Sequence, residues 1–271
     1  MKTWKKIVLG VSLISLFLGG GLVAWGYSQG GLTDLQNQTK SEQDYVKKEV
    51  DDFNKIDIKS SSYNVLIKNG EVDKATLSYY QKTKNPIDTS VKDGQLTIND
   101  NNSELDSTSN KHINFFGLKD LVRLSTLNKE VRNKTIVITL PKKQTIDFLK
   151  VDLATGNLDL SNSTIKQADI NLNVGDLTFT KMIVSNLKAN LDVGSVDSDH
   201  TLFTNSDLSI AMGDYSGDNL IFNGHNKLDV TSGDIEIVLK DYTLNVQADS
   251  HSGEVDITNN LKISKDNTLT I

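Results

Sequence analysis

A glycine recurs every 19 or 20 residues through the C-terminal half of this 271-residue chain. The position two residues after each glycine is apolar or aromatic, and so is the position three residues before it, except at Ser250. The six glycines are Gly156, Gly175, Gly194, Gly213, Gly233 and Gly253. Repeats of this length are typical of solenoids, in which each repeat forms one coil that stacks on its neighbours.

Within each repeat the apolar residues alternate by two up to the glycine, skip across it, and then alternate again. Alternation by two predicts strands, and glycine predicts a corner between two of them because it adopts positive φ at no steric cost. We therefore expect an all-β fold, with a parallel β-solenoid of about six coils over residues 136–271. The six glycines are its structural corners, and equivalent strands stack ~4.8 Å apart.

The residue after each glycine is acidic or polar, for example Asp176, Asp214 and Asp234. Such side chains accept hydrogen bonds from the amides of a turn. Stacked carboxylates also suggest a cation site, but Asn157 and Ser195 interrupt the column, neighbouring carboxylates repel one another, and the repeat differs from the nine-residue calcium-binding repeat. We therefore predict turn chemistry and no metal site at these positions.

A charge-free run, residues 7–27, follows three lysines at the N-terminus. At 1.5 Å per residue this run covers a hydrocarbon layer of ~30 Å, and the lysines place residues 1–6 in the cytoplasm by the positive-inside rule. We expect a single-pass signal-anchor in the cell membrane, with the N-terminus cytoplasmic and the C-terminal domain extracellular. A cleaved signal peptide with Ala24 and Gly26 at its cleavage site is the alternative, although the run is longer than an ordinary h-region.

Residues 28–52 are polar and lack a wide apolar stripe, so we expect a stalk with room for a short helix around residues 42–50. From Phe53 the apolar residues alternate by two, and Asp93-Gly94 has the composition of a hairpin turn. We interpret residues 53–135 as an antiparallel or mixed β lead-in. This lead-in contains a polar loop and a basic segment before the solenoid begins.

The basic segment, residues 111–134, carries six lysines and arginines against Asp120 and Glu130, in a chain whose net charge is -6. Its apolar residues would line one face of a short helix. Two roles fit it: contact with an anionic membrane or a protein partner, or a helical cap over the end of the first coil. The residues expected to make membrane or partner contact are Lys111, Phe115, Phe116, Lys119, Arg123 and Arg132.

Composition and motifs argue against several classes of function. The chain has no cysteine, which excludes disulfides and thiolate metal sites. Nucleic acid binding needs a clustered basic surface, which a chain of net charge -6 does not suggest. The four histidines fall at unrelated positions of the repeat, and no P-loop, dinucleotide-binding motif or nucleophile elbow is present. We expect no metal, no cofactor and no enzymatic activity.

The sequence resembles the bacterial "putative adhesin" β-solenoid domain family, whose function is unknown. The resemblance covers about residues 53–271 and rests on the strand ending in Leu-Pro, ITLPKKQTIDFLKVDLATGNLDL, and on corners such as DINLNVGDLTF, LSIAMGDYSG and LDVTSGDIEI. It implies a β-solenoid behind one membrane helix in a Gram-positive bacterium, and an association with envelope stress of the Lia type. The chain departs from wall-attached adhesins because it contains no LPxTG sequence.

We therefore expect a membrane-anchored, extracytoplasmic β-solenoid that acts by binding, as an adhesin-like scaffold or a cell-envelope stress accessory. Its partner would be an envelope component or another protein. The alternative is a parallel β-helix enzyme acting on envelope or host polysaccharide. Both arginines lie in the basic segment, outside the coils, and this position argues against the arginine-assisted chemistry of polysaccharide lyases.

Overall fold

The computed structural model describes residues 43–82, 85–100, 134–240, 244–247, 252–258 and 266–271. The chain divides into two compact units, Met1–Gln43 and Asp44–Ile271, and nearly all described residues belong to the second unit. No helix within the described ranges is long and apolar enough to cross a membrane. The predicted cytoplasmic tail, membrane segment 7–27 and most of the basic segment lie outside these ranges.

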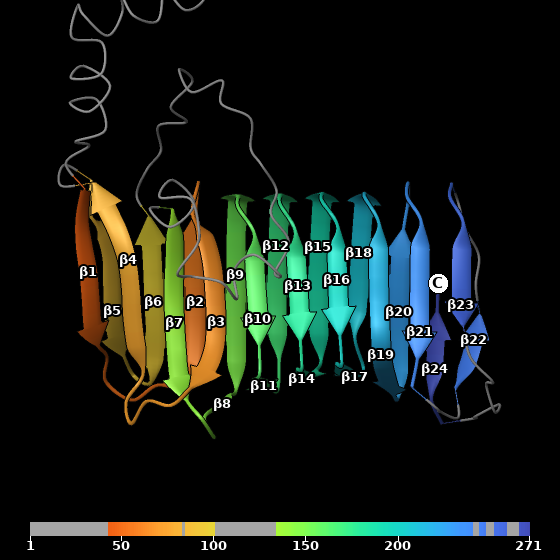
Figure 1. The fold of residues 1–271 in the computed structure, drawn as a ribbon, viewed down its shortest axis with the longest axis horizontal. Coiled ribbons are helices and arrows are strands. Elements are labelled where there is room, and N and C mark those ends of the chain that lie inside the picture. Colours follow the sequence, from red (N-terminus) through yellow and green to blue (C-terminus); the bar gives the residue numbers. More distant parts are fainter. Residues whose placement is uncertain (1–42, 83–84, 101–133, 241–243, 248–251, 259–265) are drawn as a thin grey trace, which may run out of the picture. The chain divides into compact units, whose positions relative to one another are not determined.

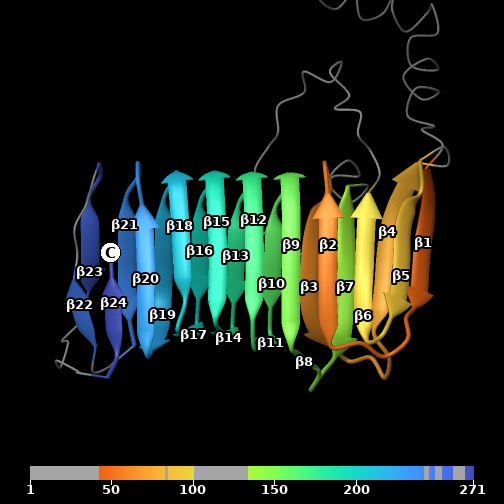
Figure 2. The ribbon, with the colours of Figure 1, turned by 180° about the vertical axis from the view of Figure 1, so that it is seen from behind.

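The second unit is built from strands that stack side by side along one axis (Figures 1 and 2). Two large sheets form, of fourteen and ten strands among the described residues. The longer sheet contains β1 (Gln43–Glu49), β3 (Asn64–Gly70), β4 (Thr76–Lys82), β7 (Thr135–Pro141), β8 (Thr145–Ile146), β10 (Leu158–Ser161), β11 (Thr164–Ile165), β13 (Leu177–Thr180), β14 (Ile183–Ser185), β16 (Val196–Asp199), β17 (Leu202–Thr204), β19 (Tyr215–Asn223), β21 (Ile235–Leu239) and β23 (Val255–Thr258). The other contains β2 (Lys55–Ser60), β5 (Ile87–Lys92), β6 (Gln95–Asp100), β9 (Phe148–Thr155), β12 (Ala168–Val174), β15 (Leu187–Val193), β18 (Asp207–Met212), β20 (His225–Val230), β22 (Asn245–Gln247) and β24 (Thr268–Thr270).

The stacked strands present three outer surfaces. Face A is the outer side of β3, β7, β10, β13, β16, the first half of β19, β21 and β23. Face B is the outer side of β2, β6, β9, β12, β15, β18 and β20. The narrow face is the outer side of β8, β11, β14, β17 and the second half of β19, which bends between two faces.

Neighbouring parallel strands pair residues that lie one 19-residue repeat apart in the sequence. Leu158 pairs with Leu177, Leu177 with Val196, and Val196 with Tyr215, each one coil further along. The same one-repeat offset joins β9 to β12 and β12 to β15 on face B. The predicted all-β, mostly parallel solenoid is confirmed.

Aliphatic columns fill the interior of the solenoid, as the alternation predicts. Val151, Ile170 and Ala189 are each at most 1% exposed and stack in consecutive coils. Further along the stack, Phe179, Phe203 and Phe222 form an aromatic ladder in the core. The ring centroids of Phe179 and Phe203 lie 5.3 Å apart, and those of Phe203 and Phe222 lie 5.7 Å apart. Stacked coils thus share one continuous apolar core.

The N-terminal lead-in belongs to the same stack, but its coils are not in chain order. The coil of β2 and β3 lies between the strands β6 and β7 on one side and β9 and β10 on the other. β4 and β5 pair antiparallel with β7 and β6, so the lead-in is mixed, within the alternatives that the sequence left open. Strands β1, β4 and β5 therefore form the N-terminal end of the stack in the described part of the chain.

One expectation for the stalk is wrong. Residues 43–49 form strand β1 at the edge of the longer sheet, where we had allowed a short helix, and Val50 is buried at 9% exposed. Tyr45 packs on Tyr80 of β4, with ring centroids 4.8 Å apart. The backbone of this stretch finds its partners in β4, so tertiary pairing overrides a weak local pattern.

Candidate binding surface

The six repeat glycines form one column at the corner between face B and face A. Their φ angles lie between 140° and 151°, a region that side chains with a Cβ rarely adopt. A Cβ at Gly194 would also overlap the carbonyl oxygen of Gly175, and the same overlap recurs along the column. Glycine is therefore required by both the backbone conformation and the close approach of neighbouring coils.

The residues that follow the glycines hydrogen-bond from coil to coil. The amide of Asp176 donates to Asn157 Oδ1 at 3.0 Å, the amide of Ser195 donates to Asp176 Oδ1 at 3.0 Å, and the amide of Asp234 donates to Asp214 Oδ1 at 2.9 Å. Each side chain thus accepts the backbone amide of its successor. The carboxylates in this column have turn partners, which is the chemistry that the sequence indicated.

Face B carries balanced charge. One row of outward side chains alternates in sign through five consecutive pairings, in the order Asp57, Lys150, Asp169, Lys188, Asp207 and Lys227. The next row holds an amide ladder, in which Asn190 Nδ2 donates to Asn171 Oδ1 at 2.9 Å and Asn171 Nδ2 donates to Asp152 Oδ1 at 3.0 Å. Neighbouring coils on this face therefore attract one another.

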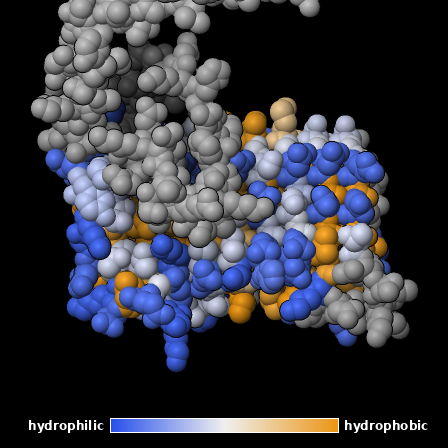
Figure 3. Space-filling model, in the orientation of Figure 1, coloured by the Kyte–Doolittle hydropathy of each residue, from blue (hydrophilic) through white to orange (hydrophobic). Residues whose placement is uncertain are grey.

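Face A is acidic beyond its first strands. No lysine or arginine occurs in the face A strands β10, β13, β16, β19, β21 and β23, whereas the outward positions of these strands include six carboxylates. Two of the cross-strand pairs bring like charges together, Asp199 with Asp218 and Glu236 with Asp256. We call the outward residues Asp197, Asp199, Asp218, Glu236 and Asp256 the distal acidic patch. Figure 3 looks onto this face and shows hydrophilic side chains over the strands far from the N-terminal end.

The first strands of face A behave differently. Leu66, Asp159 and Thr178 occupy one row, on β3, β10 and β13, and all three point outward between inward-facing neighbours. They are nevertheless buried, at 4%, 2% and 6% exposed. Burial raises the pKa of the Asp159 carboxyl to about 7, and although Thr178 donates a hydrogen bond to it, Asp159 Oδ2 has no partner. We call these three residues the proximal patch.

A fourth surface is the edge formed by the glycine corners. Val193 and Met212, which directly precede two of the glycines, are 42% and 58% exposed, and apolar side chains stand at the upper edge of Figure 3. β1 begins at this edge, as Figure 1 shows, so the chain enters the second unit there. The chain also leaves after Asp100 and returns at Lys134 on this edge, because β6 ends and β7 begins there.

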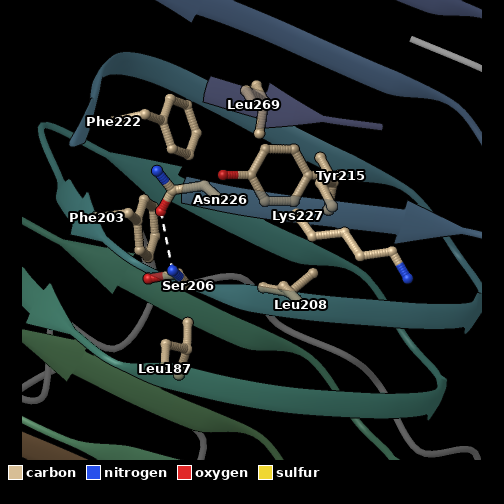
Figure 4. A pocket seen from close by; sticks show the side chains of 10 residues that line it. Leu187, Phe203, Ser206, Leu208, Tyr215, Phe222, Asn226, Lys227 and Leu269 are labelled. Atoms are coloured by element: carbon tan, nitrogen blue, oxygen red, sulfur yellow. Dashed lines mark hydrogen bonds between the residues drawn. The ribbon is translucent and has the colours of Figure 1, made fainter. Parts of the chain in front are cut away.

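Two hollows of different size lie between described residues. One cavity of about 20 Å³, shown in Figure 4, has room for a single water molecule. At its wall the amide of Ser206 donates to Asn226 Oδ1 at 3.0 Å, and burial raises the pKa of the Tyr215 hydroxyl. A more open hollow of about 190 Å³ lies by the N-terminal strands, between Lys48–Asp51 and Thr89–Val91.

The structure brings some of the predicted residues together and leaves others aside. The glycines form the single column described above, whereas Lys111, Phe115, Phe116, Lys119, Arg123 and Arg132 lie outside the described residues. The sequence reasoning missed the contrast between faces A and B. The sequence does contain this signal. Alternate residues of each strand point outward, and the charges at these outward positions differ between the strands of face A and those of face B.

Comparison with known proteins gives matches to solved structures and to one family. The chain is similar to a structure titled "putative cell adhesion protein" from Clostridium sporogenes, at 14% identity over 84% of this chain and 98% of the other, with a TM-score of 0.33. A "putative adhesin" from Bacteroides fragilis matches at 14% identity over 86% and 98% of the two chains, with a TM-score of 0.34. No curated protein matches the sequence. The family model described as Toastrack DUF4097 matches residues 53–268, and the chain therefore belongs to the toastrack family.

Proposed function

We propose that this chain is a membrane-tethered, extracytoplasmic binding protein of the cell envelope, adhesin-like or accessory to envelope stress, and that it acts without catalysis. Its binding surface is the distal acidic patch, and its partner is a cationic component of the envelope or a protein with a basic surface.

The observation that carries the proposal is the segregation of charge between two faces built by one repeat. Face B alternates in sign across neighbouring coils, so the repeat is able to place opposite charges side by side. Face A instead places Asp199 beside Asp218 and Glu236 beside Asp256, at a cost in stability of roughly 0.2–1 kcal/mol per pair. A surface that retains such repulsion gains from a cationic partner, which relieves it on binding.

The length of chain before β1 is compatible with a tether. Fifteen residues, 28–42, separate the predicted membrane segment from β1, and fully extended they reach about 50 Å. Most of the distal acidic patch is exposed, including Asp197, Asp218 and Glu236, so a partner can reach it.

Site-specific photo-cross-linking in the native host tests the proposal with the full chain. A photoreactive residue at Ser216, within the distal acidic patch, should capture a partner with a basic surface, whereas the same residue at Asn190 on face B should not. Reversing two charges with Asp218→Lys and Glu236→Lys should abolish capture, and Asp169→Lys with Asp207→Lys should leave it unchanged. Equal capture from both faces, or capture that survives the reversal on face A, would refute the acidic surface.

Location is tested separately in the same host. Because the chain has no cysteine, a single Asp218→Cys substitution gives one reactive thiol. A membrane-impermeant maleimide should label it in intact cells, and Thr3→Cys should react only after lysis. Labelling of Asp218→Cys that requires lysis would contradict an extracytoplasmic solenoid.

A further inference from the structure

The ten-stranded sheet ends in a strand whose outer edge pairs with no described strand. This strand, β5, is the last in the order of the sheet and lies at the N-terminal end of the stack (Figure 2). Its antiparallel ladder with β6 is regular from the pair Ile87–Asp100 to the pair Lys92–Gln95, without a bulge. A straight, regular edge is a template for a further strand unless something guards it.

The edge strand of the other sheet, β1, carries such a guard, whereas β5 does not. The side chain of Lys48 in β1 points inward and donates to Thr89 Oγ1, and an inward-pointing charge discourages pairing at an edge. The inward residues of β5 are the uncharged Ile87, Thr89 and Val91. Val91 packs against the core but is only partly buried, and it lines the open hollow at this end. A further strand beside β5 would cover it.

Alternate residues of β5 turn their backbone groups toward the open edge. The amide of Ile87 donates to Gln81 Oε1 at 3.2 Å rather than to β6, so Ile87 is in the phase that faces away from β6. Thr89 and Val91 are in the same phase, because the phase of an antiparallel ladder repeats every two residues. An added strand would therefore bond to Thr89 and Val91.

We propose that the open edge of β5 pairs with β5 of a second copy of this chain. In the antiparallel register that places Ser90 opposite its own equivalent, Thr89 lies opposite Val91 of the second copy, and each such pair exchanges two hydrogen bonds. This contact between copies does not rest on the cationic partner proposed for the distal acidic patch.

Charge favours this register and this partner. Asp88 and Lys92 are exposed near the two ends of β5, about 13 Å apart, so they are too far from each other to pair within one strand. The register centred on Ser90 sets Asp88 opposite Lys92 of the second copy at both ends, and both pairs are attractive. A shift of two residues is the smallest that keeps the hydrogen bonds in phase, and it breaks both pairs. The strand is thus complementary to itself.

Disulfide cross-linking of the full-length chain in detergent micelles tests this register. Because the chain has no cysteine, Ser90→Cys gives a single thiol, and its Cα would lie about 4.5 Å from its equivalent, within disulfide range. Thr97→Cys on β6, which pairs with Ser90, is the control, because two further strand spacings separate it from its equivalent. With copper phenanthroline as oxidant, Ser90→Cys should form covalent dimers at least tenfold faster than Thr97→Cys. Equal rates would overturn the proposal.

Charge reversal identifies the partner. In the Ser90→Cys chain, either Lys92→Asp or Asp88→Lys places like charges opposite each other and should slow dimerisation roughly fivefold or more. The two reversals together restore opposite charges and should restore the rate, while Lys143→Asp, away from β5, should change nothing. An unchanged circular dichroism spectrum shows that the coils remain folded.

Three results would overturn the assignment. The first is a single reversal without effect, and the second is a double reversal that dimerises as slowly as the single ones. The third is a Ser90→Cys chain that stays monomeric when pure but forms a disulfide with another protein in the native host, which would give the edge to a different partner.

Discussion

Replacing Gly194 by alanine tests whether the glycine column holds the solenoid together. A residue with a Cβ at φ 147° costs about 1–3 kcal/mol of backbone strain. The new Cβ also overlaps the Gly175 carbonyl and pushes two coils apart, which weakens the bonds from Gly194 N to Met212 O at 3.0 Å and from Gly175 N to Val193 O at 2.9 Å. At about 0.5–1.5 kcal/mol for each hydrogen bond, the total loss is roughly 2–6 kcal/mol.

Urea unfolding followed by circular dichroism measures this loss, with Gly70→Ala as the matched control. Gly70 does not have φ in the left-handed region, and its added Cβ would meet only the Cγ2 methyl of Thr139, at 2.8 Å. The control should lose about 1 kcal/mol or less, as is usual for substitutions away from strained positions. If Gly194→Ala costs no more than Gly70→Ala, the column is not the constraint that the steric argument requires.

Two further substitutions probe the core and face A. Phe203→Ala removes the middle ring of the buried aromatic ladder and should lower the free energy of unfolding in urea by about 3–5 kcal/mol. Ile183→Ala on the narrow face, where the side chain is 48% exposed, should lower it by under about 1 kcal/mol. Similar losses for the two variants would contradict the ladder's role. Asp218→Lys places a cation beside Asp199 and should raise the free energy of unfolding by about 0.5 kcal/mol while it weakens partner capture; lower stability would show that the like charges do not repel.

The glycine period predicted the register of the coils because each glycine performs the same task in every repeat. The other corners were harder to see, since several residue types serve there. Asn162, Lys181, His200 and Asn219 all adopt φ near 50° one corner after the glycine, and no single residue type marks the column. His200 therefore looked unrelated to any repeat position although it occupies an equivalent turn.

The order of the N-terminal coils was beyond sequence reasoning for a different reason. β7 follows the insertion and pairs with β3 rather than with the strands of the following repeat, so the coil of β2 and β3 is inserted between later ones. Pairings of this kind join residues about seventy positions apart, such as Val65 with Ile136, and no local pattern specifies them. The buried carboxyl of Asp100 fits this order, because it accepts from Ser60 Oγ at 2.6 Å at the adjacent corner.

The inward and outward positions of this fold carry different constraints, and this difference explains where binding surfaces arise. Inward residues and corner glycines are fixed by packing and backbone geometry, so their variation costs stability directly. Outward residues contact neighbours along a row and, as Lys227 and Asp229 do, between rows. A whole face can therefore change its charge at less than about 1 kcal/mol per pair. The two broad faces show both outcomes, with alternating charges on face B and like charges on face A. A cationic partner on face A would compensate the like charges there by the same physical means that the lysines provide on face B.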